Sequence, residues 1–135
     1  MAPLLFVDTW FLIARYDRLD GHHAVARAIE RRFGSAILFA HDAVLSEFLA
    51  YVAGYGEYHR VEAVRFIRRF MDRAVVLPAD RELFLTAVDF FEDRRDKAYS
   101  LVDCMSMLVM RAHGIQHVLS NDHHFSQEGF TLLNA

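Results

Sequence analysis

Short runs of apolar residues, each the length of a strand, alternate with longer segments in which apolar residues recur at helical spacing. The runs are apolar throughout and do not alternate with polar residues, which is typical of strands buried on both faces of a parallel sheet. We predict four such strands and a short last one, at residues 4–7, 36–40, 74–77, 117–120 and 131–133.

The segments between these runs predict helices. Helices are expected at residues 9–16, 22–33, 57–71, 80–93 and 100–113, and a further helix starts after Asp42 as its N-cap and stops near Gly54. Gly114 takes the usual C′ position after the helix at 100–113. Apolar strands separated by helices indicate an α/β fold. We therefore predict one domain over residues 1–135, a three-layer α/β/α domain with a central, mainly parallel sheet of four to five strands.

The chain is rich in apolar residues, which make up 54% of its 135 positions against a usual share of about 45–50%. Either a well-filled core or a surface buried in a homodimer explains this excess. Cys104 is the single cysteine, which fits a reducing cytoplasm. No uncharged run approaches the ~20 residues that a membrane helix needs, and residues 1–3 lack the basic start of a secretory signal. We therefore expect a cytoplasmic protein that does not contact a membrane.

Acidic residues directly follow two of the predicted strands. Asp8 comes after the first strand and Asp122 after the strand at 117–120. In open parallel sheets, ligands bind beyond the carboxyl ends of the strands. Asp103 begins the helix that leads into the second of these strands, so the chain can return to the same edge of the sheet. Together with Glu47, these acids form a candidate site for a divalent metal ion.

Each acid also has an ordinary structural role open to it. Asp8 can cap the helix that follows it, Asp122 can cap the turn after it, and Glu47 lies off the apolar stripe of its helix, as a solvated residue would. Asp103 forms an S-x-x-D capping box with Ser100. Asp103 is nevertheless the only charged residue in most of its helix, which is apolar nearly all round, and an unpaired carboxylate there would be costly.

The chemistry of four carboxylates points to a hard cation. Oxygen ligands alone favour Mg²⁺ or Mn²⁺ over zinc, and such ions can activate water for phosphodiester hydrolysis. The chain has no Gly-rich phosphate loop, and its eight histidines show no convincing metal-binding spacing. The net charge of −3 provides no basic field to attract RNA, but a bound metal would reverse the local sign. Because clustered carboxylates repel one another, some should bind protons unusually readily without metal, and added metal should stabilise the fold.

Two other phosphate-handling families are excluded. Haloacid-dehalogenase phosphatases need a second acid two residues after the first, where this chain has Trp10. Asp122-His123-His124 spells the signature of the DHH phosphoesterases, but too little chain follows it for the large domain of that family.

Four segments resemble those of the PIN-domain ribonucleases. FVDT at residues 6–9 matches the opening strand of that family, and SEFL at 46–49 matches the helix of its second acid. Residues 100–115 are similar to the helix of its third acid, and LSNDHHF at 119–125 to its closing motif. The resemblance covers essentially the whole chain and is closest to the VapC-like toxins of type II toxin–antitoxin modules.

The resemblance implies a Mg²⁺- or Mn²⁺-dependent endoribonuclease that acts on RNA, forms a homodimer and is silenced by a cognate antitoxin. It also implies four catalytic, metal-holding acids: Asp8, Glu47, Asp103 and Asp122. Thr9, Asn121 and Ser100 would support these acids, and Ser120 stands where the motif commonly has threonine. Two alternatives remain, namely a PIN nuclease of RNA processing without a toxin role and a catalytically silent PIN-like interaction module.

An aromatic-rich stretch offers a candidate surface for a partner. It contains Tyr51, Tyr55 and Tyr58, with Phe48 nearby. These side chains either receive a segment of an antitoxin or pack internally.

Overall fold

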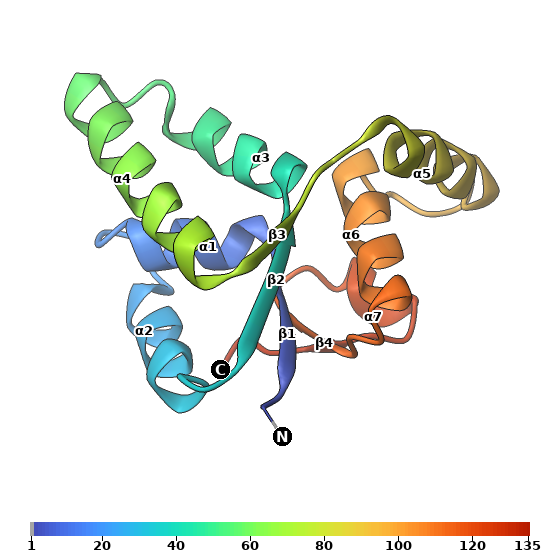
Figure 1. The fold of residues 1–135 in the computed structure, drawn as a ribbon, viewed down its shortest axis with the longest axis horizontal. Helices are drawn as coiled ribbons and strands as arrows, with labels where there is room; N and C mark the ends of the chain where they lie inside the picture. Colours follow the sequence, from blue (N-terminus) through green and yellow to red (C-terminus); the bar gives the residue numbers. More distant parts are fainter. Residues whose placement is uncertain (1) are drawn as a thin grey trace.

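Figure 1 shows the computed structural model of the chain, which describes residues 2–135. A central sheet of parallel strands has the order β3-β2-β1-β4-β5. The strands are β1 (Leu4–Val7), β2 (Ile37–His41), β3 (Val75–Leu77), β4 (His117–Leu119) and β5 (Thr131–Leu132). The predicted α/β fold with a parallel sheet is confirmed.

Helices cover both faces of this sheet. On one side lie α1 (Thr9–Tyr16), α2 (His23–Arg32) and α4 (Glu57–Arg73); on the other lie α5 (Arg81–Asp93), α6 (Leu101–Ala112) and α7 (His124–Gln127), as Figure 1 shows. The remaining helix, α3 (Asp42–Val52), extends from the end of β2 and packs against α1 and α4. Within residues 2–135, no helix is both long enough and apolar enough to span a bilayer.

The order of the strands determines where chemistry can occur. The central strand β1 pairs in parallel with β2 on one side and with β4 on the other. The carboxyl ends of all three strands therefore meet at one edge of the sheet. The connections that leave this edge begin at Asp8, at Asp42 and at Ser120.

The helices begin and end within two residues of their predicted bounds, and two local predictions need correction or refinement. Asp42 is not an N-cap: β2 pairs with β3 as far as His41, so His41 takes the cap position and Asp42 is the first residue of α3. The turn expected after Asp122 is the short helix α7. Gly114 ends α6 with a φ of +65°, which a residue with a side chain rarely adopts, so its predicted position is confirmed.

Aromatic side chains fill the core on both faces of the sheet. Phe6 on β1, Phe48 on α3 and Phe125 on α7 are completely buried. The centre of the Phe48 ring lies 5.6 Å from that of Tyr16 and 5.5 Å from that of Phe66. Phe48 therefore joins α3 to α1 and α4, and it anchors the helix that carries Glu47.

The tyrosines near Phe48 lie at the surface. Tyr51, Tyr55 and Tyr58 are 37%, 56% and 72% exposed, whereas Phe48 is buried. The prediction that these side chains pack internally is therefore correct for Phe48 and wrong for the three tyrosines. That this surface binds an antitoxin stays a prediction.

We expect Phe48→Ala to lower the free energy of unfolding by about 4 kcal/mol, because it removes a buried ring and leaves a cavity. Tyr58→Ala is the matched control: Tyr58 is 72% exposed on α4, so its truncation should cost about 1 kcal/mol or less. Urea denaturation of both variants measures the difference. Equal losses would contradict the assignment of Phe48 to the core.

Candidate functional site

Asp8 lies at the end of the central strand, and its side chain is turned towards the neighbouring strand β4. Its backbone N–H donates to the carbonyl of Leu119 at 3.3 Å. Asp8 as a whole is 7% exposed, and its carboxylate accepts a 2.6 Å hydrogen bond from the Ser120 hydroxyl. The same hydroxyl oxygen accepts from the backbone N–H of Asp122 at 3.0 Å. Asp8 thus bonds to Ser120 instead of capping α1, and Ser120 joins it to the region of Asp122.

Burial raises the pKa of Asp8 to about 7 from its ordinary 3.8. Hydrogen bonds from Ser120 and from the backbone at Thr9 act in the opposite direction, and the charges of Asp103 and Glu47 raise the pKa further. The expectation that some carboxylates bind protons readily is therefore correct for Asp8. Its main cause is loss of hydration, with repulsion between the acids a smaller contribution.

Asp103 caps its helix and faces the other acids at the same time. Its Oδ2 accepts the backbone N–H of Ser100 at 2.9 Å, and its own N–H donates to the Ser100 hydroxyl at 3.0 Å. This is the predicted capping box. Burial raises the pKa of Asp103, against the lowering effect of the Ser100 backbone, and the charge of Asp122 raises it further. Asp103 therefore caps its helix and still faces Asp122 and His124.

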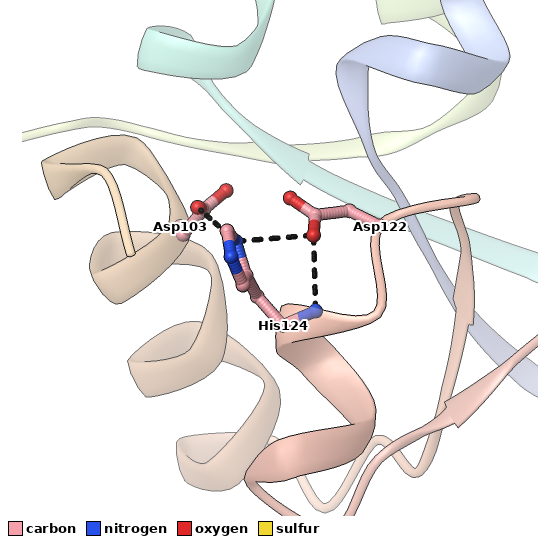
Figure 2. Close-up of side chains that lie close together, drawn as sticks. All are labelled: Asp103, Asp122 and His124. Atoms are coloured by element: carbon pink, nitrogen blue, oxygen red, sulfur yellow. Dashed lines mark hydrogen bonds and ion pairs between the residues drawn. The ribbon is translucent and has the colours of Figure 1, made fainter. Parts of the chain in front are cut away.

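Asp122 and His124 form one local unit at the start of α7. The Oδ1 atom of Asp122 accepts the backbone N–H of His124 at 2.9 Å, so Asp122 does hold the turn that follows it. The ring of His124 then folds back towards both acids, as Figure 2 shows. Its Nδ1 lies 3.1 Å from Asp122 Oδ1 and 3.5 Å from Asp103 Oδ2.

His124 is a site residue that the sequence analysis missed. Asp103, Asp122 and His124 each place one donor atom within 4.8 Å of the others. The histidines show no metal-binding spacing along the chain. His124 instead meets two acids, Asp103 on α6 and Asp122 in the loop before α7. The local signal was present, since Asp122 and His124 are two residues apart in a turn.

The other predicted site residues have separate partners: Thr9 contacts Glu47, whereas Asn121 contacts Asn134. Glu47 is exposed on α3, and its carboxylate accepts a short hydrogen bond from the hydroxyl of Thr9, which is buried. Thr9 therefore orients Glu47. Asn121 is exposed, and its side-chain oxygen accepts a 3.4 Å hydrogen bond from Asn134.

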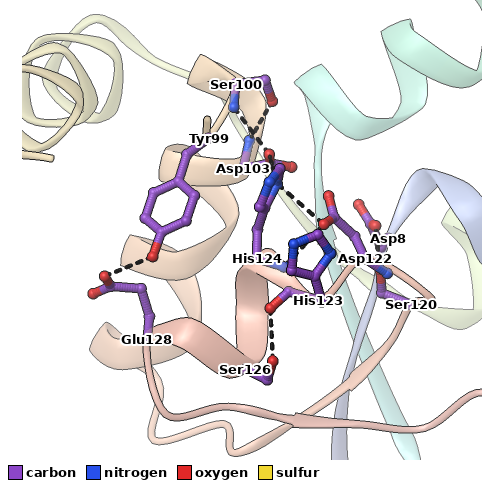
Figure 3. Close-up of polar contacts among 10 residues, drawn as sticks. All are labelled: Asp8, Tyr99, Ser100, Asp103, Ser120, Asp122, His123, His124, Ser126 and Glu128. Carbon is purple, nitrogen blue, oxygen red and sulfur yellow. Dashed lines mark hydrogen bonds and ion pairs between the residues drawn. The ribbon is translucent and has the colours of Figure 1, made fainter. Parts of the chain in front are cut away.

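A second polar cluster lies beside His124; Figure 3 shows two of its members, Tyr99 and Glu128. The ring of Tyr99 lies edge-on to that of His124, with 5.4 Å between centres. The Tyr99 hydroxyl donates to Glu128 at 2.8 Å. Arg94 and Arg111 also donate to Glu128, at 2.9 Å and 2.8 Å. The hydrogen bond from Arg94, followed by those from Tyr99 and Arg111, lowers the pKa of Glu128 to about 2.

The acids are brought together at one edge, with Glu47 at the margin. Ser120 links Asp8 to the Asp122 loop, while Asp103 and Asp122 share His124. A separate cavity of about 450 Å³ lies between α1, α2 and α4, with Phe11, Phe66 and Arg69 among its lining residues. The acids do not line this cavity, so we assign the chemistry to the edge of the sheet.

The model of the PIN domain family matches residues 5–130. The chain belongs to the PIN domain family. The match spans all four acids and almost all of the fold. No curated protein matches the chain by sequence.

Solved structures show the same fold over the whole PIN domain. VapC20 of Mycobacterium tuberculosis, a Sarcin-Ricin loop cleaving toxin, is 28% identical, with a TM-score of 0.83 over 97% of this chain and 99% of that one. VapBC2 from Rickettsia felis, bound to a DNA fragment from its promoter, is 10% identical, with a TM-score of 0.67 over 97% and 98% of the two chains. DNA-bound VapBC from Salmonella typhimurium is 13% identical, with a TM-score of 0.66 over 97% of each. The predicted resemblance to VapC-like PIN domains is confirmed.

The residues of this PIN domain fit a divalent cation. Asp103 and Asp122 each place an oxygen within 4.8 Å of the other, and Ser120 links Asp8 to the Asp122 loop. Within residues 2–135, no lysine or arginine is among the polar contacts of these three acids. The Nδ1 atom of His124 is buried, and it finds no hydrogen-bond partner of suitable alignment in the described chain despite its closeness to Asp122. A metal ion would satisfy this orphaned atom and the crowded oxygens together.

Asp8→Asn should stabilise the metal-free protein at neutral pH. Because the pKa of Asp8 is about 7 in the fold and near 3.8 when unfolded, the unfolded chain loses this proton first as pH rises. The free energy of unfolding therefore falls between about pH 4 and pH 7 and is constant above. Asn removes this dependence, so the variant should gain up to about 4 kcal/mol at pH 8 and nothing at pH 4.

Urea denaturation in EDTA at several pH values measures this difference, with Asp89→Asn, an exposed acid on α5, as the control. A variant no more stable than the parent protein at pH 8 would contradict the burial of an ionisable Asp8.

Proposed function

We propose that this chain is a metal-dependent endoribonuclease that hydrolyses phosphodiester bonds in RNA and acts as the toxin of a toxin–antitoxin pair. The observation that carries the proposal is the meeting of Asp8, Asp103 and Asp122 at one edge of the sheet. Membership of the PIN domain family and the likeness to VapC20 support it.

The acids that would hold Mg²⁺ or Mn²⁺ are Asp8, Asp103 and Asp122, with Glu47 at the outer side. Such an ion supplies activation of water and stabilisation of the leaving oxygen. The site excludes a zinc centre built on thiolates, since Cys104 is buried and is the sole cysteine of the chain.

The residues of the chain prepare the acids for this task. Ser120 orients Asp8, the capping box orients Asp103, and Thr9 orients Glu47. Because each carboxylate is held by a hydrogen bond, little conformational entropy remains to be lost when a ligand binds. Without an ion, burial raises the pKa of Asp8 to about 7, and a bound cation would favour the charged form of this carboxylate.

The toxin role rests on relatives. VapC20 is a toxin that cleaves the Sarcin-Ricin loop, and at 28% identity it provides a substrate class for this chain, a structured ribosomal RNA loop. The VapBC structures support a protein antitoxin as partner.

We infer a cytoplasmic homodimer, which the exposed Phe91 and Leu85 of α5 favour. Light scattering on the purified protein would test the homodimer.

Two other functions are compatible with the same fold. A PIN nuclease of RNA processing would cleave RNA but would not arrest growth. A silent PIN-like module would bind partners without cleavage, but it would have no need to keep Asp8 buried and Asp103 half-buried at a cost to stability.

Purified protein should cleave RNA in Mn²⁺ or Mg²⁺, and EDTA should abolish the cleavage. Asp8→Asn and Asp103→Asn should each reduce the rate by at least about 100-fold, because each removes a carboxylate from the site. Gel analysis of a labelled ribosomal stem–loop measures the rates. The exposed Asp89→Asn should retain full activity, and circular dichroism verifies that each variant folds. Cleavage that persists in both site variants would exclude this site.

Expression of the chain alone in a bacterial host should arrest growth, and the Asp103→Asn variant should not. The toxin role also requires a small antitoxin gene next to that of this chain, and co-expression of that gene should restore growth and yield a co-purified complex. Cleavage in vitro without growth arrest would favour the RNA-processing function over the toxin role.

A further inference from the structure

We propose that His124 is a ligand of the divalent ion and that its ring nitrogen makes the site prefer Mn²⁺ to Mg²⁺. This inference rests on the proposed function, since it concerns the ion which that function requires. It extends the site from carboxylate oxygens alone to a mixed set of oxygen and nitrogen donors.

The position of one nitrogen atom is the first observation. His124 Nδ1 lies 3.1 Å from Asp122 Oδ1 and 3.5 Å from Asp103 Oδ2. It is buried, yet its alignment with these oxygens is not that of a hydrogen bond, and no other partner is found within residues 2–135. A buried imidazole nitrogen without a hydrogen bond is unusual in a folded protein. The lone pair of Nδ1 is available to a metal when the proton is on Nε2.

The ring cannot easily turn away from the acids. The backbone N–H of His124 is bonded to the same Asp122 oxygen that faces Nδ1. Tyr99 packs edge-on against the ring, and the Tyr99 hydroxyl is held by Glu128 at 2.8 Å. Figure 3 shows the ring between this tyrosine and the acids. The nitrogen is therefore directed at the acids before any ion arrives.

The separations between the donor atoms suit a single ion. Two neighbouring ligands of a six-coordinate dication, each bonded at about 2.1 Å, lie about 3 Å apart. The observed separations of 3.1 Å and 3.5 Å from Nδ1 are close to this value. All three donor atoms of the set lie within 4.8 Å of one another.

The donor set determines the preference for one ion. Mg²⁺ takes oxygen ligands almost exclusively and keeps several waters. Imidazole nitrogen is a ligand of the first-row transition metals; Mn²⁺ binds such sites least tightly among them, but it accepts nitrogen more readily than Mg²⁺ does. A site with two or three carboxylates and one imidazole should therefore bind Mn²⁺ more tightly than Mg²⁺.

A competing explanation is that His124 acts only as a cationic partner of the two acids. In that case the ring would occupy the place of the ion, and a bound metal would have no nitrogen among its ligands. A spectroscopic measurement on bound Mn²⁺ separates the two explanations, because a directly bonded nitrogen couples to the electron spins of the metal.

The test uses the full chain with Mn²⁺ or Mg²⁺ alone and no RNA. Pulsed electron paramagnetic resonance of bound Mn²⁺ should show coupling to one imidazole nitrogen. His124→Asp should lose this coupling while still binding Mn²⁺, and His124→Asn serves as a second variant if the first does not fold. His123→Gln is the matched control: His123 is exposed, with its ring 4.8 Å from that of His124, and its replacement should leave the coupling unchanged.

Calorimetry adds the preference between the ions. The parent protein should bind Mn²⁺ roughly tenfold or more tightly than Mg²⁺, and His124→Asp should reduce this ratio roughly tenfold. Bound Mn²⁺ without nitrogen coupling, or an unchanged ratio in the variant, would overturn the inference and leave the proposed nuclease intact. Failure to bind either ion would overturn both.

Discussion

The hydroxyl of Ser120 connects two halves of the site that are far apart in the chain. It donates to Asp8, which lies 112 residues away, and it accepts from the backbone of Asp122. This arrangement exists only because β1 and β4 are neighbours in the sheet and run in the same direction. The parallel pairing of these two strands is thus the constraint on which the site depends. Threonine at this position would preserve the hydroxyl, as the resemblance to PIN-domain motifs implies.

This arrangement lowers the stability of the fold, because it removes carboxylates from water. Burial is the main reason why the pKa values of Asp8 and Asp103 are raised, so at neutral pH the site opposes folding. Arg94 and Arg111 are both bonded to Glu128, whose pKa is lowered to about 2. The charge of these arginines is thus paired beside Tyr99, and within residues 2–135 the polar contacts of Asp8, Asp103 and Asp122 include no arginine or lysine.

Much of this arrangement follows from rules that act along the chain. The apolar runs predict the strands, and the parallel direction of the strands predicts that Asp8 and Asp122 lie at one edge. The capping box of Ser100 and Asp103 is local, so it too was predictable. The position of Asp42 was not, because the end of β2 is determined by its pairing with β3, where His41 lies opposite Leu77. The degree to which Asp8 is buried likewise depends on tertiary packing.

The orientation of the His124 ring could not be predicted from residue type and spacing. The Asp-x-His spacing was visible, but a histidine in a surface turn ordinarily faces water. Its ring turns inward here because Tyr99 packs against it, and Tyr99 is held by Glu128, the C-cap of α7. No spacing rule connects Tyr99 to this short helix. The carboxylates of such a site can be located from strand ends and caps, whereas its full donor set depends on which side chain the surrounding packing turns towards them.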